Sequence, residues 1–208
     1  MTAASAAAVA LLLVAGTAAC NQGDGRTLRP PPPGATAPPL PSSSTTAAAV
    51  IGPPVGSSDT IALALGSAAF ADGSPIPDVY GCEGGNVSPP LEWSGVAPQA
   101  AELAIVVTDP DAGGFIHWVV AGISPAVTGV AEGALPEGAV EARNDTSEFG
   151  WFGPCPPAGD AAHRYVFTLY ALDADTGVEI GAGGAEAIAA ITRVRGSAAT
   201  ITGTFAVS

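Results

Sequence analysis

Residues 102–111 read Glu-Leu-Ala-Ile-Val-Val-Thr-Asp-Pro-Asp, an apolar run that ends in two carboxylates on either side of a proline. Because its middle is continuously apolar, it predicts a β-strand covered on both faces. Pro110 lacks an N–H group and has a fixed φ, so it ends the strand and holds Asp109 and Asp111 in one turn. Taken alone, an Asp-Pro-Asp sequence is an ordinary turn. Whether it belongs to a functional site depends on the other residues of the chain.

Four further stretches are rich in β-branched and aromatic residues or alternate in polarity, with Gly and Pro between them. They cover residues 60–65, 117–123, 164–172 and 200–207. One helix is expected from Ala185 to about Arg195, since Ile188 and Ile191 fall on one face and Gly196 follows as a stop signal. The sequence therefore predicts a mainly β domain with a helix near its C-terminus.

The charge is concentrated in the C-terminal part of the chain. The 208 residues carry a formal net charge of −13. Residues 59–208 hold 18 acids and 4 arginines, which gives this part −14. Such a surface cannot neutralise a row of phosphates, so nucleic acid is not expected as a partner. A basic patch for anionic membrane surfaces is disfavoured for the same reason.

The first 58 residues have a different composition. Residues 6–19 form an apolar run, too short for an ordinary membrane span, that ends in small residues directly before Cys20. This resembles the bacterial lipoprotein signal, so residues 1–20 are expected to be a signal peptide whose Cys20 is lipidated and anchors the protein outside the cytoplasm. The alternative is a plain signal peptide cut after Thr17-Ala18-Ala19, which leaves a secreted protein and an incidental Cys20.

Residues 21–58 lack hydrophobic periodicity and are rich in Pro, Ser, Thr and Ala. Such a segment cannot bury enough apolar area to offset its ordering entropy, so it is expected to be a disordered tether. Residues 59–208 are then the folded domain.

Two histidines, His117 and His163, each begin a predicted strand. Asp109 or Asp111 facing a histidine could fix its tautomer and raise its pKa. Residues 150–157, Gly-Trp-Phe-Gly-Pro-Cys-Pro-Pro, are either a stiff surface loop or a pocket rim whose glycines expose N–H groups to an anion. In the second interpretation an amphipathic cavity is lined by Trp118, Trp151, Phe152 and Tyr165.

Five stretches, taken jointly, resemble the phosphatidylethanolamine-binding protein family, also called Raf-kinase-inhibitor-like proteins, and its bacterial branch in particular. They are residues 86–93 (Asn-Val-Ser-Pro-Pro-Leu-Glu-Trp), 103–111, 117–120 (His-Trp-Val-Val), 153–157 (Gly-Pro-Cys-Pro-Pro) and 163–170 (His-Arg-Tyr-Val-Phe-Thr-Leu-Tyr). The resemblance covers residues 70–207.

The resemblance implies an antiparallel β-sandwich of a large and a small sheet with a small anion-binding cavity. By motif position the cavity would be formed by Asp109, Asp111, His117, Gly153, Pro154, His163 and Tyr165. Family members accept phosphate-like or carboxylate-like groups there, including phospholipid head groups, and some inhibit kinases or serine proteases. We therefore expect a binding protein without a cofactor, with a small anion, a phospholipid head group or a protease as partner.

Two other functions are left open by the residues. A hydrolase could use one of the histidines as general base, although no Gly-x-Ser-x-Gly sequence is present. A metal could be held by the two histidines and two aspartates, although their spacing is not that of a known metal motif.

Three cysteines are present, at positions 20, 82 and 155. If Cys20 is lipidated, Cys82 and Cys155 remain as an even pair in an oxidising compartment, and a disulfide between them is expected. The alternative is two buried free thiols.

Overall fold

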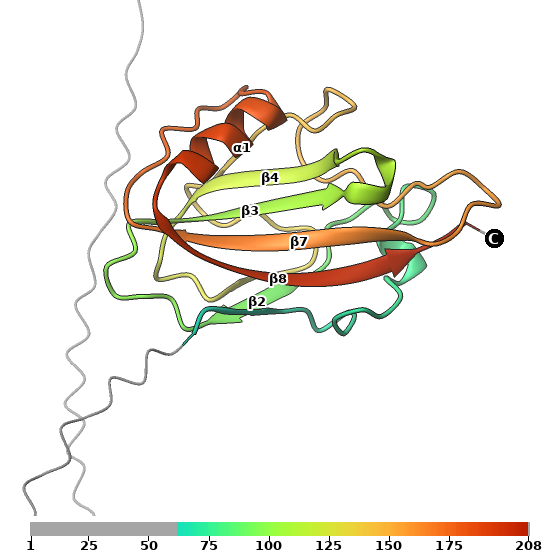
Figure 1. The fold of residues 1–208 in the computed structure, drawn as a ribbon, viewed down its shortest axis with the longest axis horizontal. Coiled ribbons are helices and arrows are strands. Elements are labelled where there is room, and N and C mark those ends of the chain that lie inside the picture. The colour runs from blue at the N-terminus through green and yellow to red at the C-terminus, as the bar shows by residue number, and fades with distance from the viewer. Residues whose placement is uncertain (1–61, 208) are drawn as a thin grey trace, which may run out of the picture. The chain divides into compact units, whose positions relative to one another are not determined.

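The computed structural model describes residues 62–207. The expected signal peptide, Cys20 and the expected tether lie outside the described residues. A large antiparallel sheet of five strands dominates the domain (Figure 1). In spatial order its strands are β6 (Val140–Glu141), β4 (Phe115–Ile123), β3 (Glu102–Asp109), β7 (His163–Leu172) and β8 (Gly196–Phe205).

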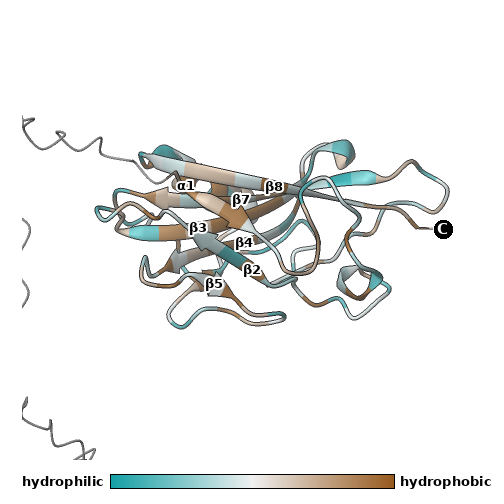
Figure 2. Ribbon diagram, turned by 90° about the horizontal axis from the view of Figure 1, so that it is seen from below, coloured by the Kyte–Doolittle hydropathy of each residue, from teal (hydrophilic) through white to brown (hydrophobic). Residues whose placement is uncertain are grey.

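A small antiparallel sheet packs beneath it, formed by β1 (Ala64–Gly66), β2 (Leu91–Ser94) and β5 (Gly129–Val130). Figure 2 shows β2 and β5 below the strands of the large sheet. The predicted β-sandwich of a large and a small antiparallel sheet is confirmed. The remaining regular elements are two short 3-10 helices, η1 (Asp78–Tyr80) and η2 (Pro110–Ala112), and the helix α1 (Gly184–Arg193).

Strand β3 is central and is covered on both faces, as its sequence predicts. Leu103, Ile105 and Val107 point into the core between the sheets. Ala104 and Val106 point to the opposite face and pack in a second cluster that includes Ala187 and Ile191 of α1. Alternating side chains of one strand thus serve two cores, which is why this stretch is apolar throughout.

The boundaries of several elements differ from those predicted. The first strand is confined to residues 64–66, and residues 60 and 61 lie outside the described part. The helix ends at Arg193, because Gly196 already begins β8, where a Cβ atom would clash with the carbonyl oxygen of Ala171. The short strands β2, β5 and β6 carry too few residues to show a pattern of their own. Between residues 62 and 207 we find no helix that is both long and apolar enough to span a membrane.

Candidate functional site

The strand order brings the polar residues to one end of the large sheet. Strand β3 ends at Asp109, and its two antiparallel neighbours begin beside that point, with Asp109 opposite Phe115 of β4 and Thr108 opposite Val166 of β7. The first residues of β4 and β7 therefore meet the last residues of β3. Both histidines lie at these strand starts.

Asp109 organises this end of the sheet although it is only 2% exposed. Its Oδ1 atom accepts hydrogen bonds from the N–H groups of Asp111 and Ala112, at 2.8 and 3.0 Å, and so caps η2. Its Oδ2 atom lies 2.7 Å from Nδ1 of His163. Both carboxylate oxygens of Asp109 are thus hydrogen-bonded within the protein.

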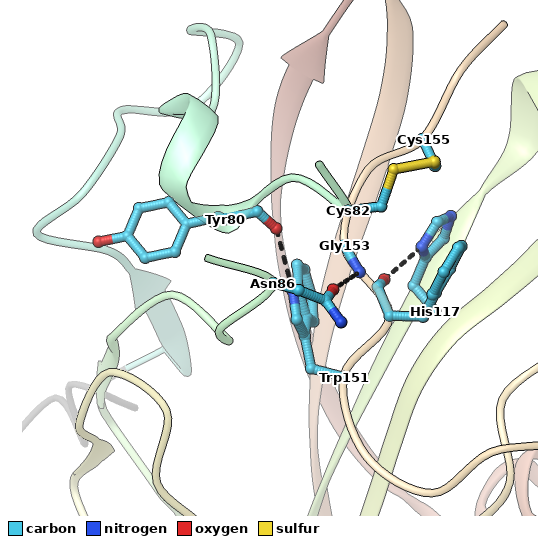
Figure 3. The surroundings of a disulfide bond; sticks show 8 residues. Tyr80, Cys82, Asn86, His117, Trp151, Gly153 and Cys155 are labelled. Carbon is cyan, nitrogen blue, oxygen red and sulfur yellow. Dashed lines mark hydrogen bonds between the residues drawn. A yellow bond between two sulfur atoms is a disulfide. The ribbon is translucent and has the colours of Figure 1, made fainter. Parts of the chain in front are cut away.

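His117 is also buried, and its Nδ1 atom lies 2.6 Å from the carbonyl oxygen of Phe152. The expected pairing of a histidine with Asp109 or Asp111 is therefore absent at His117, because the loop at residues 150–157 brings a backbone carbonyl to this ring instead. Figure 3 shows the second ring nitrogen turned away from that carbonyl. Burial lowers the pKa of His117, although the Phe152 carbonyl and the charge of Asp109 oppose the shift.

Tyr165 contributes a hydroxyl group at the same place. Its side chain is fully buried, and within residues 62–207 its hydroxyl oxygen makes no hydrogen bond of good geometry, although Asp109 and the Cys155 backbone lie near it. Burial, together with the nearby charge of Asp109, raises the pKa of Tyr165 far above its ordinary value, so the group stays a neutral donor. An unpaired buried hydroxyl is unfavourable, and it points to a partner supplied from outside the protein.

These groups line a cavity of about 90 Å³. That is on the order of three water molecules and suits a group of a few non-hydrogen atoms. Its walls are a mixture of polar and apolar side chains, namely Asp109, Ala112, Phe115, His117, Phe152, Cys155, Pro156, Pro157, His163 and Tyr165. The sequence reasoning did not assign Phe115, although its place before His117 on the same strand was a usable signal.

Asp111 is outside the cavity, contrary to the expectation. Its carboxylate receives Nε and Nη2 of Arg164 at 3.0 and 2.7 Å, and also the backbone N–H of Arg164 at 2.8 Å. The Arg164 guanidinium lowers the pKa of Asp111 to about 2. Asp111 therefore fastens η2 to β7, and the sequence reasoning missed the role of Arg164.

Gly153 and Pro154 support the cavity from behind and do not line it. The N–H group of Gly153 donates to Oδ1 of Asn86 at 2.7 Å, so it is not available to an anion as expected (Figure 3). A Cβ atom at Gly153 would clash with the carbonyl oxygen of Tyr80, which explains the glycine. Pro154 accepts a hydrogen bond from the N–H of Cys82.

Trp118 and Trp151 were expected to line the cavity, and this is wrong. Trp118 is buried in the core between the sheets and donates from Nε1 to Oε1 of Glu141 at 2.7 Å. Trp151 packs against that core, stacks on Phe167 and donates to the carbonyl of Tyr80. Large indole rings bury more area in the core than at a small cavity. Of the four expected aromatic residues, only Phe152 and Tyr165 line the cavity.

A disulfide joins Cys82 to Cys155 (Figure 3). Cys155 is part of the cavity wall, and Cys82 lies in the loop that also contains Asn86. The bond therefore fastens this loop to the wall of the cavity. Within residues 62–207, no three His, Cys, Asp or Glu side chains are grouped so as to hold a metal ion.

Protonation of His117 is expected to couple stability to pH. Its pKa in the folded state lies below the ordinary 6.5, so below that pH the unfolded chain binds more protons. The contribution of neutral His117 to the free energy of unfolding is fully present above pH 6.5, and it is lost as the pH falls toward the folded-state pKa. Urea unfolding in phosphate-free buffer should show a smaller stability loss between about pH 6.5 and 5 for His117→Gln than for the wild type. An equal loss in both proteins would contradict the assignment.

Fold and site together define a two-sheet β-sandwich protein with a small cavity at one end of its large sheet. The chain belongs to the phosphatidylethanolamine-binding protein family, whose model matches residues 66–206. It is 47% identical over 145 residues to a Mycobacterium tuberculosis protein named "Putative lipoprotein LppC", an alignment that spans 69% of this chain and 72% of the relative.

Two solved structures have the same fold. The phosphatidylethanolamine-binding protein homologue CT736 of Chlamydia trachomatis superposes with a TM-score of 0.66 at 39% identity, over 71% of this chain and 99% of its own. Escherichia coli YbcL, a member of the same family, superposes with a TM-score of 0.67 at 33% identity, over 70% and 99%.

Proposed function

We propose that the protein is a non-enzymatic binding protein that holds a phosphate- or carboxylate-sized anionic group between His117, His163 and Tyr165. The buried, unpartnered hydroxyl of Tyr165 is the observation that carries the proposal. An anion oxygen in the cavity would accept this hydrogen bond and remove the penalty of leaving the hydroxyl unpaired.

The two imidazoles supply the remaining donors. Nδ1 of His163 is hydrogen-bonded to Asp109, and Nδ1 of His117 is hydrogen-bonded to the Phe152 carbonyl. The Nε2 atom of each ring is therefore left for a ligand. In the protonated form Nε2 donates, and a charged hydrogen bond to an anion is stronger than a neutral one. Because Asp109 already accepts three hydrogen bonds, its charge repels the anion less.

The cavity is large enough for the anionic group alone, so a larger ligand would leave most of its body outside. A phospholipid head group and a free phosphate share this chemistry. A hydrolase with a serine, threonine or cysteine nucleophile is not favoured, because the residues lining the cavity include no serine or threonine and the cysteine among them is bonded in the disulfide. The family is also one of binding proteins.

Titration calorimetry with inorganic phosphate tests the proposal. Tyr165→Phe removes one hydrogen bond to a charged group and is expected to weaken phosphate binding by about 10- to 100-fold. Its stability should be unchanged or slightly higher, since an unpaired buried hydroxyl is lost. Affinity should also rise as the pH falls, because burial holds His117 neutral in the free protein and binding favours its protonated form.

The matched control is Tyr80→Phe, which removes a hydroxyl that donates to Glu132 at 2.8 Å, and this residue does not line the cavity. Its phosphate affinity should equal that of the wild type. Equal affinities for the Tyr165→Phe variant and the wild type, or no binding at millimolar phosphate, would overturn the proposal.

The location proposed for the protein is the outer face of the cell membrane, with Cys20 as the lipidated residue and residues 21–58 as the tether. The name of the mycobacterial relative supports this location. Cys20→Ser is expected to move the protein from the membrane fraction to the soluble fraction. If the wild type is already found in the culture medium, the alternative of plain secretion holds instead.

A further inference from the structure

Strand β8 forms one edge of the large sheet, and its second half is covered (Figure 1). Thr202 and Thr204 direct their backbone groups away from β7, toward residues 72–76. The carbonyl of Thr202 accepts from the N–H of Gly73 at 2.6 Å, and its N–H donates to Asp72 Oδ1 at 2.8 Å. The N–H of Thr204 donates to the carbonyl of Ser74, and its carbonyl accepts from the N–H of Ile76.

The first half of β8 has the same geometry without the cover. The register with β7 runs unbroken from Gly196 to Phe205, so Ala198 and Thr200 must also direct their N–H and C=O groups outward. Both residues are exposed, and their outward groups have no hydrogen-bond partner among residues 62–207. Unpaired backbone groups at a sheet edge are a template for another strand.

Natural edge strands usually carry charges, prolines or bulges that prevent such pairing. Residues 196–200 read Gly-Ser-Ala-Ala-Thr and contain none of these. A groove of about 880 Å³ lies directly beside them. Gly196, Ser197 and Ala198 line the groove together with Ala62, Leu63 and residues of the loop at 95–100. An added strand would therefore have both backbone partners and room for side chains.

Two arginines that form no ion pair within residues 62–207 give this edge positive charge. Arg193 and Arg195 line the groove, and neither forms an ion pair within residues 62–207. The other two described arginines are engaged, Arg164 by Asp111 and Arg143 over the ring of Phe149. Asp173 is the one acid lining the groove, and its N–H group donates to the carbonyl of Arg195.

We propose that residues 196–200 of β8 are a docking edge for an extended acidic segment of a partner polypeptide, which adds a sixth strand to the large sheet. Backbone hydrogen bonds to Ala198 and Thr200 would hold the segment, as in other cases of strand addition. Its carboxylates would pair with Arg193 and Arg195. The negative charge elsewhere on the domain would repel such a segment and so direct it to this edge.

Fluorescence anisotropy with a labelled peptide of alternating threonine and valine, flanked by two glutamates at each end, tests this docking edge. Ala198→Pro removes an outward N–H group without removing a hydrogen bond to β7, and it should weaken peptide binding at least about tenfold. Replacing Arg193 and Arg195 by alanine should weaken it about three- to tenfold at low salt, and less at high salt.

Three controls accompany the measurement. Arg143→Ala should bind like the wild type, a peptide with lysines in place of the glutamates should bind more weakly, and Ala198→Pro should keep the wild-type stability. Unchanged peptide binding by Ala198→Pro would overturn the proposal. So would strong hydrogen-exchange protection of the Ala198 and Thr200 amides in the free protein, or a dimer that Ala198→Pro dissociates, because the edge would then already be covered.

Discussion

Asp109→Asn is expected to destabilise the domain by about 2–3 kcal/mol and to abolish phosphate binding at millimolar concentrations. The asparagine carbonyl can still cap η2, but its amide replaces the charged acceptor that Nδ1 of His163 now has at 2.7 Å. His163 then loses the hydrogen-bond acceptor that orients its ring. Urea unfolding and phosphate calorimetry on the same preparation measure the two effects.

Asp72→Asn serves as the matched control. Asp72 is exposed and also accepts a backbone N–H through its Oδ1 atom, that of Thr202 at 2.8 Å, but it has no histidine partner. The Asp72→Asn substitution should change the free energy of unfolding by at most about 1 kcal/mol and leave phosphate binding intact. A phosphate affinity of Asp109→Asn equal to that of the wild type would contradict the role given to the Asp109–His163 pair.

Replacing both Cys82 and Cys155 by alanine is expected to lower the free energy of unfolding by about 4 kcal/mol. The two residues are 73 positions apart, and closing a loop of this length restricts the unfolded chain by roughly that amount. Phosphate affinity should fall as well, because Cys155 is part of the cavity wall and the bond fastens that wall to the loop containing Asn86.

Reduction of the wild type provides an independent comparison. The wild type in excess reductant should show the same loss of stability as the double variant, and the double variant should not respond to reductant. If the double variant unfolds within about 1 kcal/mol of the oxidised wild type, the disulfide does not stabilise the domain as described.

The sequence was most informative at residues whose chemistry allows only one structural role. The apolar run at residues 103–107 predicted a central strand, because only a strand with two covered faces needs side chains of that kind on both. Pro110 marked the end of this strand, and the histidines marked the starts of its neighbours. Antiparallel pairing brings Asp109, His163 and Tyr165 together, and it was the family resemblance that placed these three residues in one cavity.

Contacts made by backbone groups or by distant loops could not be predicted in this way. The partner of His117 is the carbonyl of Phe152, 35 residues away, and any residue carries such a carbonyl. The N–H of Gly153 is taken by Asn86, which is 67 residues away. Trp118 and Trp151 are as suitable for a core as for a cavity wall, and only the packing of the two sheets decides between them.

The most direct test of the anion cavity is a titration of the protein with inorganic phosphate, observed through the imidazole nitrogen signals of His117 and His163 by NMR. The Nε2 signals of both rings are predicted to shift together and to saturate with one phosphate per chain, and the signal of His117 is predicted to move toward the protonated form. If neither signal responds at phosphate concentrations at which the protein remains folded, the cavity between these rings and Tyr165 does not bind the anion.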